Sequence, residues 1–218
     1  MQAVYIVFSA TPYKMGRFIR TVLHNRYNHV SLAFDEDLST MYSYARFHVN
    51  VPLYGGFVSE SPCRHFCGET VSYIKICRIE LEDENYRHLR RFVESMEDGG
   101  GKYIYNTYSA MLAPLHIRLL IRDSYTCAEF VGDALSIAGF ELPLGAYHSL
   151  PSTERILAPY VIYEGTCDGY VSDPMWGKDK FPERMGRVNA MKATMRSFTR
   201  LTARAIVSMA ALLIDIPW

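Results

Sequence analysis

The sequence has none of the features that mark a membrane-spanning, secreted or disulfide-stapled protein. No apolar run reaches the roughly 18 residues that a transmembrane helix requires. No basic segment precedes the short apolar run of residues 3–8, so we expect a strand there rather than a signal peptide. The five cysteines are odd in number and irregularly spaced, which argues against a disulfide framework. We therefore expect a reduced, cytoplasmic protein.

The chain also has no net charge, because 23 basic and 23 acidic side chains balance across 218 residues. A chain without net positive charge is not of the basic type that binds nucleic acid, and we expect no such partner. The balance nevertheless hides two unequal parts. Residues 1–177 hold 15 basic and 20 acidic side chains, whereas residues 178–218 hold 8 and 3. We expect an acidic body over 1–177 and a basic tail over 178–218.

What remains is the composition of a globular protein, with 49% hydrophobic and 21% charged residues and no repeat or low-complexity segment. Apolar periodicity predicts strands and helices in an α+β order. The expected strands cover residues 3–8, 29–34, 41–46, 70–80 and 160–164, and the expected helices cover 14–24, a stretch from 83 to about 98, 106–120 and 127–138. Residues 47–69 contain two prolines and three glycines and are predicted to form a long irregular loop.

The sharpest local signal surrounds Cys127. Thr126 and Glu129 have the spacing of a capping box, which places Cys127 at the first position of a helix. Unpaired backbone N–H groups and the positive end of the helix dipole favour a thiolate there, and the same groups can stabilise an oxyanion. The structural alternative is a small buried side chain at a helix start, which is common for free cysteine.

A nucleophilic thiolate needs a proton partner, which is usually a histidine. Among the seven histidines, His29 opens a strand whose neighbours Ser31 and Ala33 are small, which leaves space above the imidazole ring. If His29 stood alone, a purely structural role would be the better interpretation. The other six lie in predicted helices or in loops: His24, His48, His65, His88, His116 and His148.

Two segments, NHVSLAF at 28–34 and YTCAEFV at 125–131, together resemble the circularly permuted branch of the NlpC-type papain-like hydrolases. This branch includes YiiX-like proteins and, more distantly, the lecithin–retinol acyltransferase family. In it the histidine strand precedes the cysteine helix. The resemblance covers about residues 3–165, including the helix at 15–23 and the segment 143–163. It implies a permuted papain-like α+β fold with a small antiparallel sheet packed against helices, and Cys127 and His29 as the catalytic pair.

The resemblance also implies a third polar residue that orients the imidazole from the strand after the histidine. The matching position here is Ser43. A serine can accept the imidazole N–H, but it carries no charge that would stabilise an imidazolium. Two residues of the 47–69 segment are the alternatives for this role, His48 and Glu60.

The expected function is a thiol-dependent hydrolase or acyltransferase that cleaves an amide or ester bond in a small molecule, lipid or peptide. The alternative is a binding module that keeps the cleft but lacks a competent triad, and Ser43 motivates it. No cofactor is expected. Cys63, His65 and Cys67 have the spacing of half a zinc site, but no second ligand pair follows, so no metal is expected either.

Residues 183–213 differ from the body, because apolar and basic side chains recur there at three- and four-residue spacing on different faces. The pattern predicts a basic amphipathic helix at the C-terminus. Three roles are open to it: packing on the body, contact with a second copy of the chain, or peripheral binding to an anionic membrane.

Overall fold

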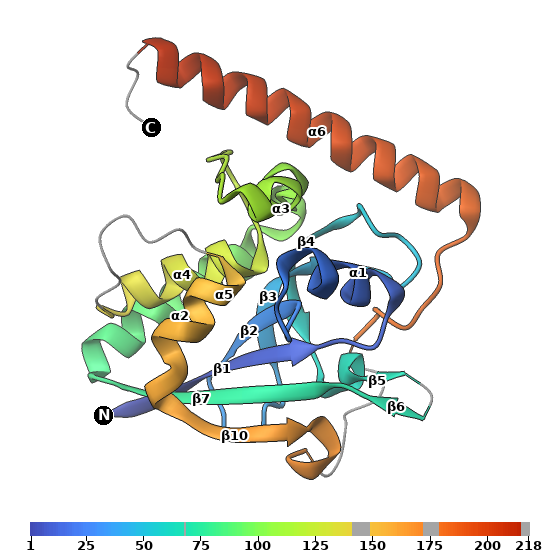
Figure 1. The fold of residues 1–218 in the computed structure, drawn as a ribbon. Coiled ribbons are helices and arrows are strands. Elements are labelled where there is room, and N and C mark those ends of the chain that lie inside the picture. The colour runs from blue at the N-terminus through green and yellow to red at the C-terminus, as the bar shows by residue number, and fades with distance from the viewer. Residues whose placement is uncertain (68, 141–148, 172–178, 215–218) are drawn as a thin grey trace.

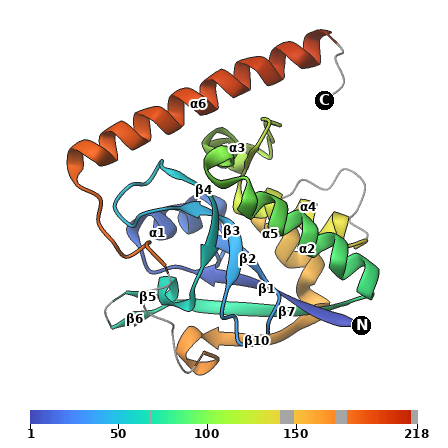
Figure 2. The ribbon, with the colours of Figure 1, turned by 180° about the vertical axis from the view of Figure 1, so that it is seen from behind.

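A computed structural model describes residues 1–67, 69–140, 149–171 and 179–214. Within these residues the fold is α+β, with an eight-stranded open sheet, a two-stranded ribbon and six α-helices (Figures 1 and 2). The predicted α+β class is therefore confirmed. Residues 141–148 lie outside the described residues, and with them the first part of the compared segment 143–163, including His148.

The main sheet is larger than the small antiparallel sheet that we expected, and it is mixed. Its strand order is β10-β7-β1-β2-β3-β4-β8-β9, and every pair is antiparallel except β8–β9. Phe66–Cys67 (β5) and Thr70–Val71 (β6) form the separate ribbon. The strands of the main sheet are Gln2–Ala10 (β1), His29–Ala33 (β2), Met41–Arg46 (β3), Gly55–Glu60 (β4), Tyr73–Leu81 (β7), Ile104–Tyr105 (β8), Ser124–Tyr125 (β9) and Val161–Thr166 (β10).

Apolar side chains cover both faces of the sheet centre, which explains why β1 is apolar almost throughout instead of alternating. Val4, Ile6 and Phe8 belong to the larger core beneath the helices, whereas Tyr5 and Val7 belong to a smaller core on the other face. The helices are Lys14–Leu23 (α1), Asp83–Asp98 (α2), Thr107–Leu112 (α3), Cys127–Ile137 (α4), Leu150–Leu157 (α5) and Arg187–Ile214 (α6).

Helix α4 is the central helix of the larger core, because it packs against β2, β3 and α2. Phe130, Val131 and Ala134 are completely buried on it. The helix is followed by Gly139, whose φ of 77° is the left-handed conformation predicted for a glycine at this place. This packing fixes the N-terminus of α4, and with it Cys127, relative to the start of β2.

The prediction of an irregular loop over residues 47–69 is wrong in its second half, where β4 pairs with β3 along its whole length. The two glycines that suggested a loop are required by close backbone contacts instead. A Cβ atom at Gly55 would collide with the carbonyl oxygen of Ala45, and one at Gly56 with that of Tyr103. Glycine at these two positions lets β4 fit between β3 and β8, and the strand ends at Glu60.

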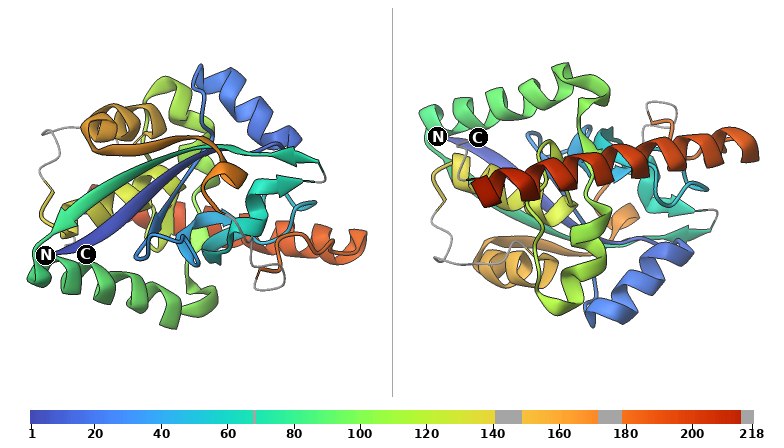
Figure 3. Two further views of the ribbon diagram at one scale, coloured as in Figure 1. Left: turned by 90° about the horizontal axis from the view of Figure 1, so that it is seen from below. Right: turned by 90° about the horizontal axis from the view of Figure 1, so that it is seen from above.

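The basic C-terminal segment forms the long helix α6, which crosses the body so that only its middle lies against it (Figures 1 and 3). Leu201 and Ala205 are buried in a third, small cluster with Ile104 and Ile121. Within the described residues no helix is both long and apolar enough to cross a membrane. Of the three roles left open for this segment, packing on the body is observed for its middle part.

Candidate active site

Cys127 is the first residue of α4, as the local sequence predicts. Thr126 is the N-cap, and both hydrogen bonds of the capping box are formed: the Glu129 amide donates to Thr126 Oγ1 (3.2 Å) and the Thr126 amide donates to Glu129 Oε2 (2.7 Å). Cys127 is 8% exposed and lines a pocket of about 690 Å³. Its sulfur therefore lies at a helix N-terminus, a position that favours negative charge.

His29 lies beside Cys127, close enough for the imidazole and the thiol to interact. On its other side, His29 Nε2 is 2.9 and 3.0 Å from the two carboxylate oxygens of Glu60. Ser31 completes this contact, because its hydroxyl donates to Glu60 Oε2 (2.8 Å) and lies 3.2 Å from His29 Nε2. Since Nε2 faces the carboxylate, Nδ1 is the ring nitrogen left for Cys127.

The charges of this group reinforce one another. Burial by itself lowers the pKa of His29, but the Glu60 carboxylate and the interaction with Cys127 outweigh it and raise the pKa to about 10. Burial likewise raises the pKa of Glu60, but the charges of His29 and Arg64 dominate and lower it to about 2. At neutral pH the site therefore holds an imidazolium and a carboxylate in contact.

The structure brings Cys127 and His29 together but places Ser43 elsewhere. The Ser43 hydroxyl is completely buried and donates to the carbonyl oxygen of Val30 at 2.7 Å, so it supports the backbone next to His29 rather than the imidazole. Of the two alternatives, His48 is half-buried and its Nδ1 donates to the Glu183 carbonyl oxygen (3.0 Å). Glu60 is the residue that contacts the imidazole.

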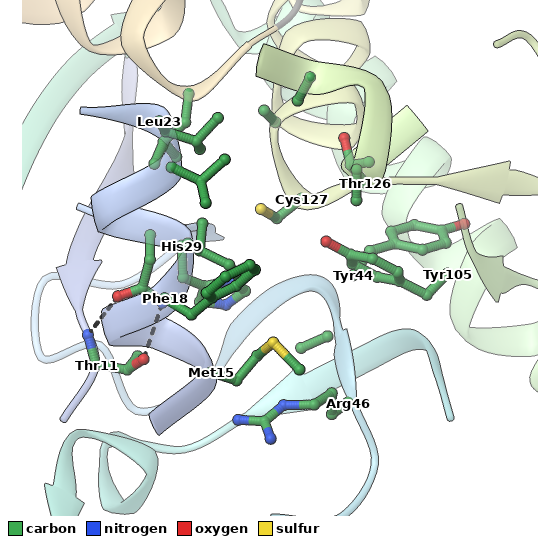
Figure 4. A pocket seen from close by; sticks show the side chains of 18 of the residues that line it. Thr11, Met15, Phe18, Leu23, His29, Tyr44, Arg46, Tyr105, Thr126 and Cys127 are labelled. Atoms are coloured by element: carbon green, nitrogen blue, oxygen red, sulfur yellow. Dashed lines mark hydrogen bonds between the residues drawn. The ribbon is translucent and has the colours of Figure 1, made fainter. Parts of the chain in front are cut away.

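A pocket of about 690 Å³ opens above Cys127 and His29. The side chains of Met15, Phe18 and Leu23 on α1 form one apolar wall (Figure 4). Figure 4 also shows the Cys127 sulfur pointing across the pocket toward His29 and α1. The sequence indicated helix α1 but not that its apolar residues face a nucleophile.

Tyr105 is the polar side chain of the opposite wall, and it lies close enough to Cys127 for their charges to interact (Figure 4). Burial raises the pKa of the Tyr105 phenol, and electrostatic interaction with Cys127 and Glu129 raises it further. The phenol is therefore protonated at neutral pH and can donate a hydrogen bond into the pocket.

Three other described cysteines have surroundings that suppress the thiolate. Burial raises the pKa of Cys63, and it raises those of Cys77 and Cys167 to about 12. Among these four thiols, Cys127 is the one that lines the pocket and contacts a histidine. Within the described part of the chain, no cluster of three or more His, Cys, Asp or Glu side chains could hold a metal ion.

Sequence reasoning missed two charged residues that stand behind Glu60, namely Arg64 and Asp179. Neither belongs to a recognisable motif, and 115 residues separate them. Comparison of the chain with protein-family models, curated proteins and solved structures found no match. The chemistry of the site therefore rests on its geometry.

Proposed function

We propose that the protein is a cysteine hydrolase or acyltransferase acting on an amide or ester bond. The observation that carries this proposal is the contact of Cys127 with His29, which Glu60 holds from its far side within a pocket. A nucleophile, a base and a group that orients the base are the elements of nucleophilic catalysis by a triad. The apolar wall of α1 favours a substrate with an apolar group next to the reacting carbonyl.

In the proposed reaction, the thiol proton of Cys127 resides on His29, so that a thiolate–imidazolium pair forms, and the sulfur attacks the carbonyl carbon. The tetrahedral oxyanion is stabilised by the backbone N–H of Cys127 at the start of α4 and by the Tyr105 phenol. The carbon–nitrogen or carbon–oxygen bond then breaks, and the imidazolium gives its proton to the departing amine or alcohol. Water or a second nucleophile attacks the thioester and releases Cys127 as a thiol.

Three features support a permuted papain-like arrangement for this fold. The histidine strand β2 precedes the cysteine helix α4 in the chain, α4 packs on the sheet next to β2, and the nucleophile begins the helix. The alternative of an inactive binding module rested on Ser43 in the third position of the triad. A buried carboxylate, Glu60, contacts the imidazole instead, and this favours the enzyme.

Incubation with p-nitrophenyl butyrate is expected to add one butyryl group to the protein, and peptide mass spectrometry should locate it on Cys127. Rapid quenching in acid preserves the thioester for the measurement. Cys127→Ala is the control and should carry no acyl group. An acyl group found on Cys63, Cys77 or Cys167, or equal labelling of the control, would contradict the proposed nucleophile.

We also propose that α6 binds the surface of an anionic membrane. Residues 187–214 contain five basic and no acidic side chains, so an anionic surface complements their charge, whereas a second copy of the same helix would repel it. The helix exposes a row of large apolar side chains, most of them more than half accessible. These are Val188, Met191, Met195, Phe198, Ile206, Val207 and Met209. A basic helix with an exposed apolar stripe is typical of interfacial binding.

The full-length protein is accordingly expected to co-sediment with phosphatidylcholine vesicles that contain phosphatidylserine, and much less with phosphatidylcholine alone. Met195→Glu/Phe198→Glu should abolish binding, and Lys192→Glu/Arg196→Glu should reduce it strongly. The matched control, Arg87→Glu/Arg91→Glu on α2, makes the same change in net charge and should reduce binding far less. Equal binding by all four proteins, or binding by none, would remove this role for α6.

A further inference from the structure

The Glu60 carboxylate has a second cationic partner besides His29. Arg64 lies four residues further along, in the short 3-10 helix Pro62–His65 that follows β4. Its Nη1 is 3.3 Å from Glu60 Oε1. Arg64 Nη1 also donates to the carbonyl oxygen of Arg46 (3.1 Å). The guanidinium is thus fixed beside Oε1 of Glu60, the oxygen that also lies 2.9 Å from His29 Nε2.

Arg64 is held in turn by Asp179, which lies in the segment that leads to α6. Its Nη2 donates to Asp179 Oδ1 at 3.0 Å, and its Nε donates to Asp179 Oδ2, so the pair is bidentate. The same carboxylate accepts from the amides of Ser61 (3.2 Å) and Phe181 (2.9 Å). A bidentate pair restricts the guanidinium in orientation as well as in distance.

We propose that Arg64 and Asp179 are positioning residues, which align Glu60 and through it His29, so that the segment 179–181 completes the active site. The inference rests on the proposed function of Cys127 and His29 and deepens it. Cys127 and His29 are the reacting groups, whereas Arg64 contacts the Glu60 carboxylate and Asp179 contacts Arg64. Their effect is transmitted through the Glu60 carboxylate.

The first reason for this assignment is that the three charged side chains behind His29 are buried. Glu60, Arg64 and Asp179 are 2%, 7% and 8% exposed, and their charges alternate along the chain from His29 to Asp179. Breaking such a buried pair leaves an uncompensated charge, so each member constrains its neighbours strongly. Without Arg64, the Glu60 carboxylate would lose one of its two cationic partners and would be less restricted to the orientation that contacts the imidazole.

Phe181 provides the second reason, because it places the same segment in the wall of the pocket. Its ring lies 4.6 Å beneath the Arg64 guanidinium, and its carbonyl oxygen accepts from the amide of Val49 at 2.9 Å. Phe181 is 4% exposed. The segment 179–181 before α6 therefore contributes directly to the site, in addition to connecting α6 to the body.

In the contact between Arg64 and Asp179, the body carries the positive charge and the tail the negative charge, the reverse of what their net charges suggest. The tail after residue 177 is basic and the body is acidic, yet an acidic tail residue, Asp179, binds a basic body residue, Arg64. General attraction between the two parts does not explain this pairing. A specific role at the site does.

Removing this support is expected to lower the pKa of the His29 imidazole and to slow acylation of Cys127. In Asp179→Asn we expect the titration of His29, followed by NMR of histidine-labelled protein, to move from about 10 toward its ordinary value of 6.5. Acylation should slow by about 10- to 100-fold, the effect of a small misplacement of a reacting group. Glu60 and Cys127 face the imidazole, His65 lies close enough to interact with it, and Arg64 and Asp179 lie behind Glu60.

Two further variants separate positioning from stability. Arg64→Met/Asp179→Leu replaces the buried pair by apolar side chains, a change that is often neutral or stabilising. We expect this double variant to stay folded but to show the lowered His29 titration and the slow acylation. Glu154→Gln is the matched control, since it removes the partner of Lys75 (2.7 Å) and should leave the His29 titration unchanged.

The double variant decides the inference. A His29 titration and an acylation rate equal to those of the wild type would show that Arg64 and Asp179 serve packing alone. A lowered His29 titration in both variants, with no acylation even in the wild type, would support the positioning role and contradict the proposed function of Cys127. The two proposals are thereby tested separately, because the NMR measurement needs no turnover.

Discussion

Cys127→Ala is expected to lower kcat/KM for ester hydrolysis by about 10⁴- to 10⁶-fold, as removal of a nucleophile does in enzymes that work through a triad. The reason is that no other described thiol can replace it. Cys127 alone among them combines a helix N-terminus, a histidine contact and a place in the pocket. The rate of p-nitrophenol release from p-nitrophenyl butyrate measures the effect.

Cys63→Ala is the control for this experiment, because Cys63 is the buried cysteine nearest in sequence to Glu60 and Arg64. Its thiol accepts a hydrogen bond from the Ser61 hydroxyl (2.8 Å), and burial raises its pKa. We expect turnover within about twofold of the wild type, as for a change away from the reacting groups. A Cys127→Ala protein with wild-type turnover would show that the reaction runs through another group.

Glu60→Gln is expected to lower kcat/KM by about 10²- to 10⁴-fold, the contribution of an aligned and charged partner to general base catalysis by histidine. Glutamine keeps the size of the side chain but loses the charge that favours the imidazolium. Ser43→Ala is the comparison, and it should cost stability through the lost bond to the Val30 carbonyl while turnover changes little. The reverse ranking of the two variants would restore Ser43 as the third member of the triad.

The same Glu60→Gln variant should also show how the ion pair of Glu60 and His29 makes the free energy of unfolding depend on pH. His29 has a pKa raised from 6.5 to about 10, so its contribution is fully present below pH 6.5 and is lost as the pH rises through 10. The pKa of Glu60 is lowered from 4.5 to about 2, so its contribution is present above pH 4.5 and is lost as the pH falls toward 2.

Urea unfolding of the wild type and of Glu60→Gln at several pH values tests this expectation. The difference in unfolding free energy should be largest between about pH 4.5 and 6.5, where both charges are present in the folded state and His29 is also protonated when unfolded. It should shrink on both sides of that window. A difference that is independent of pH would show that Glu60 and His29 do not interact as charges.

Local signals made part of this site predictable. Thr126 and Glu129 lie three residues apart, and the hydrogen bonds between them form within a single turn, so the sequence alone placed Cys127 at a helix start. The strand that begins at His29 was equally readable from its apolar pattern. The meeting of these two elements was expected from a resemblance, and the packing of α4 on β2 brings it about.

Glu60 was harder to assign, because the glycines before it are typical of a loop. Gly55 and Gly56 are needed for close contacts with the backbones of β3 and β8, which lie next to β4 only in the folded sheet. Residues 47–54 form turns and bends, as predicted for an irregular segment. The start of β4 at Gly55 depends instead on its pairing with β3 and β8. A single sequence contains no local signal for this pairing.

The sequence by itself determined the α+β class, the position of Cys127 at a helix N-terminus, the strand of His29 and the basic character of the last helix. Each depends on interactions among residues a few positions apart. Only the tertiary structure decided that Glu60 rather than Ser43 faces the imidazole, that α1 lines the pocket, and that Asp179 reaches Arg64 across 115 residues. These contacts join distant segments, and burial within a common core is what fixes them.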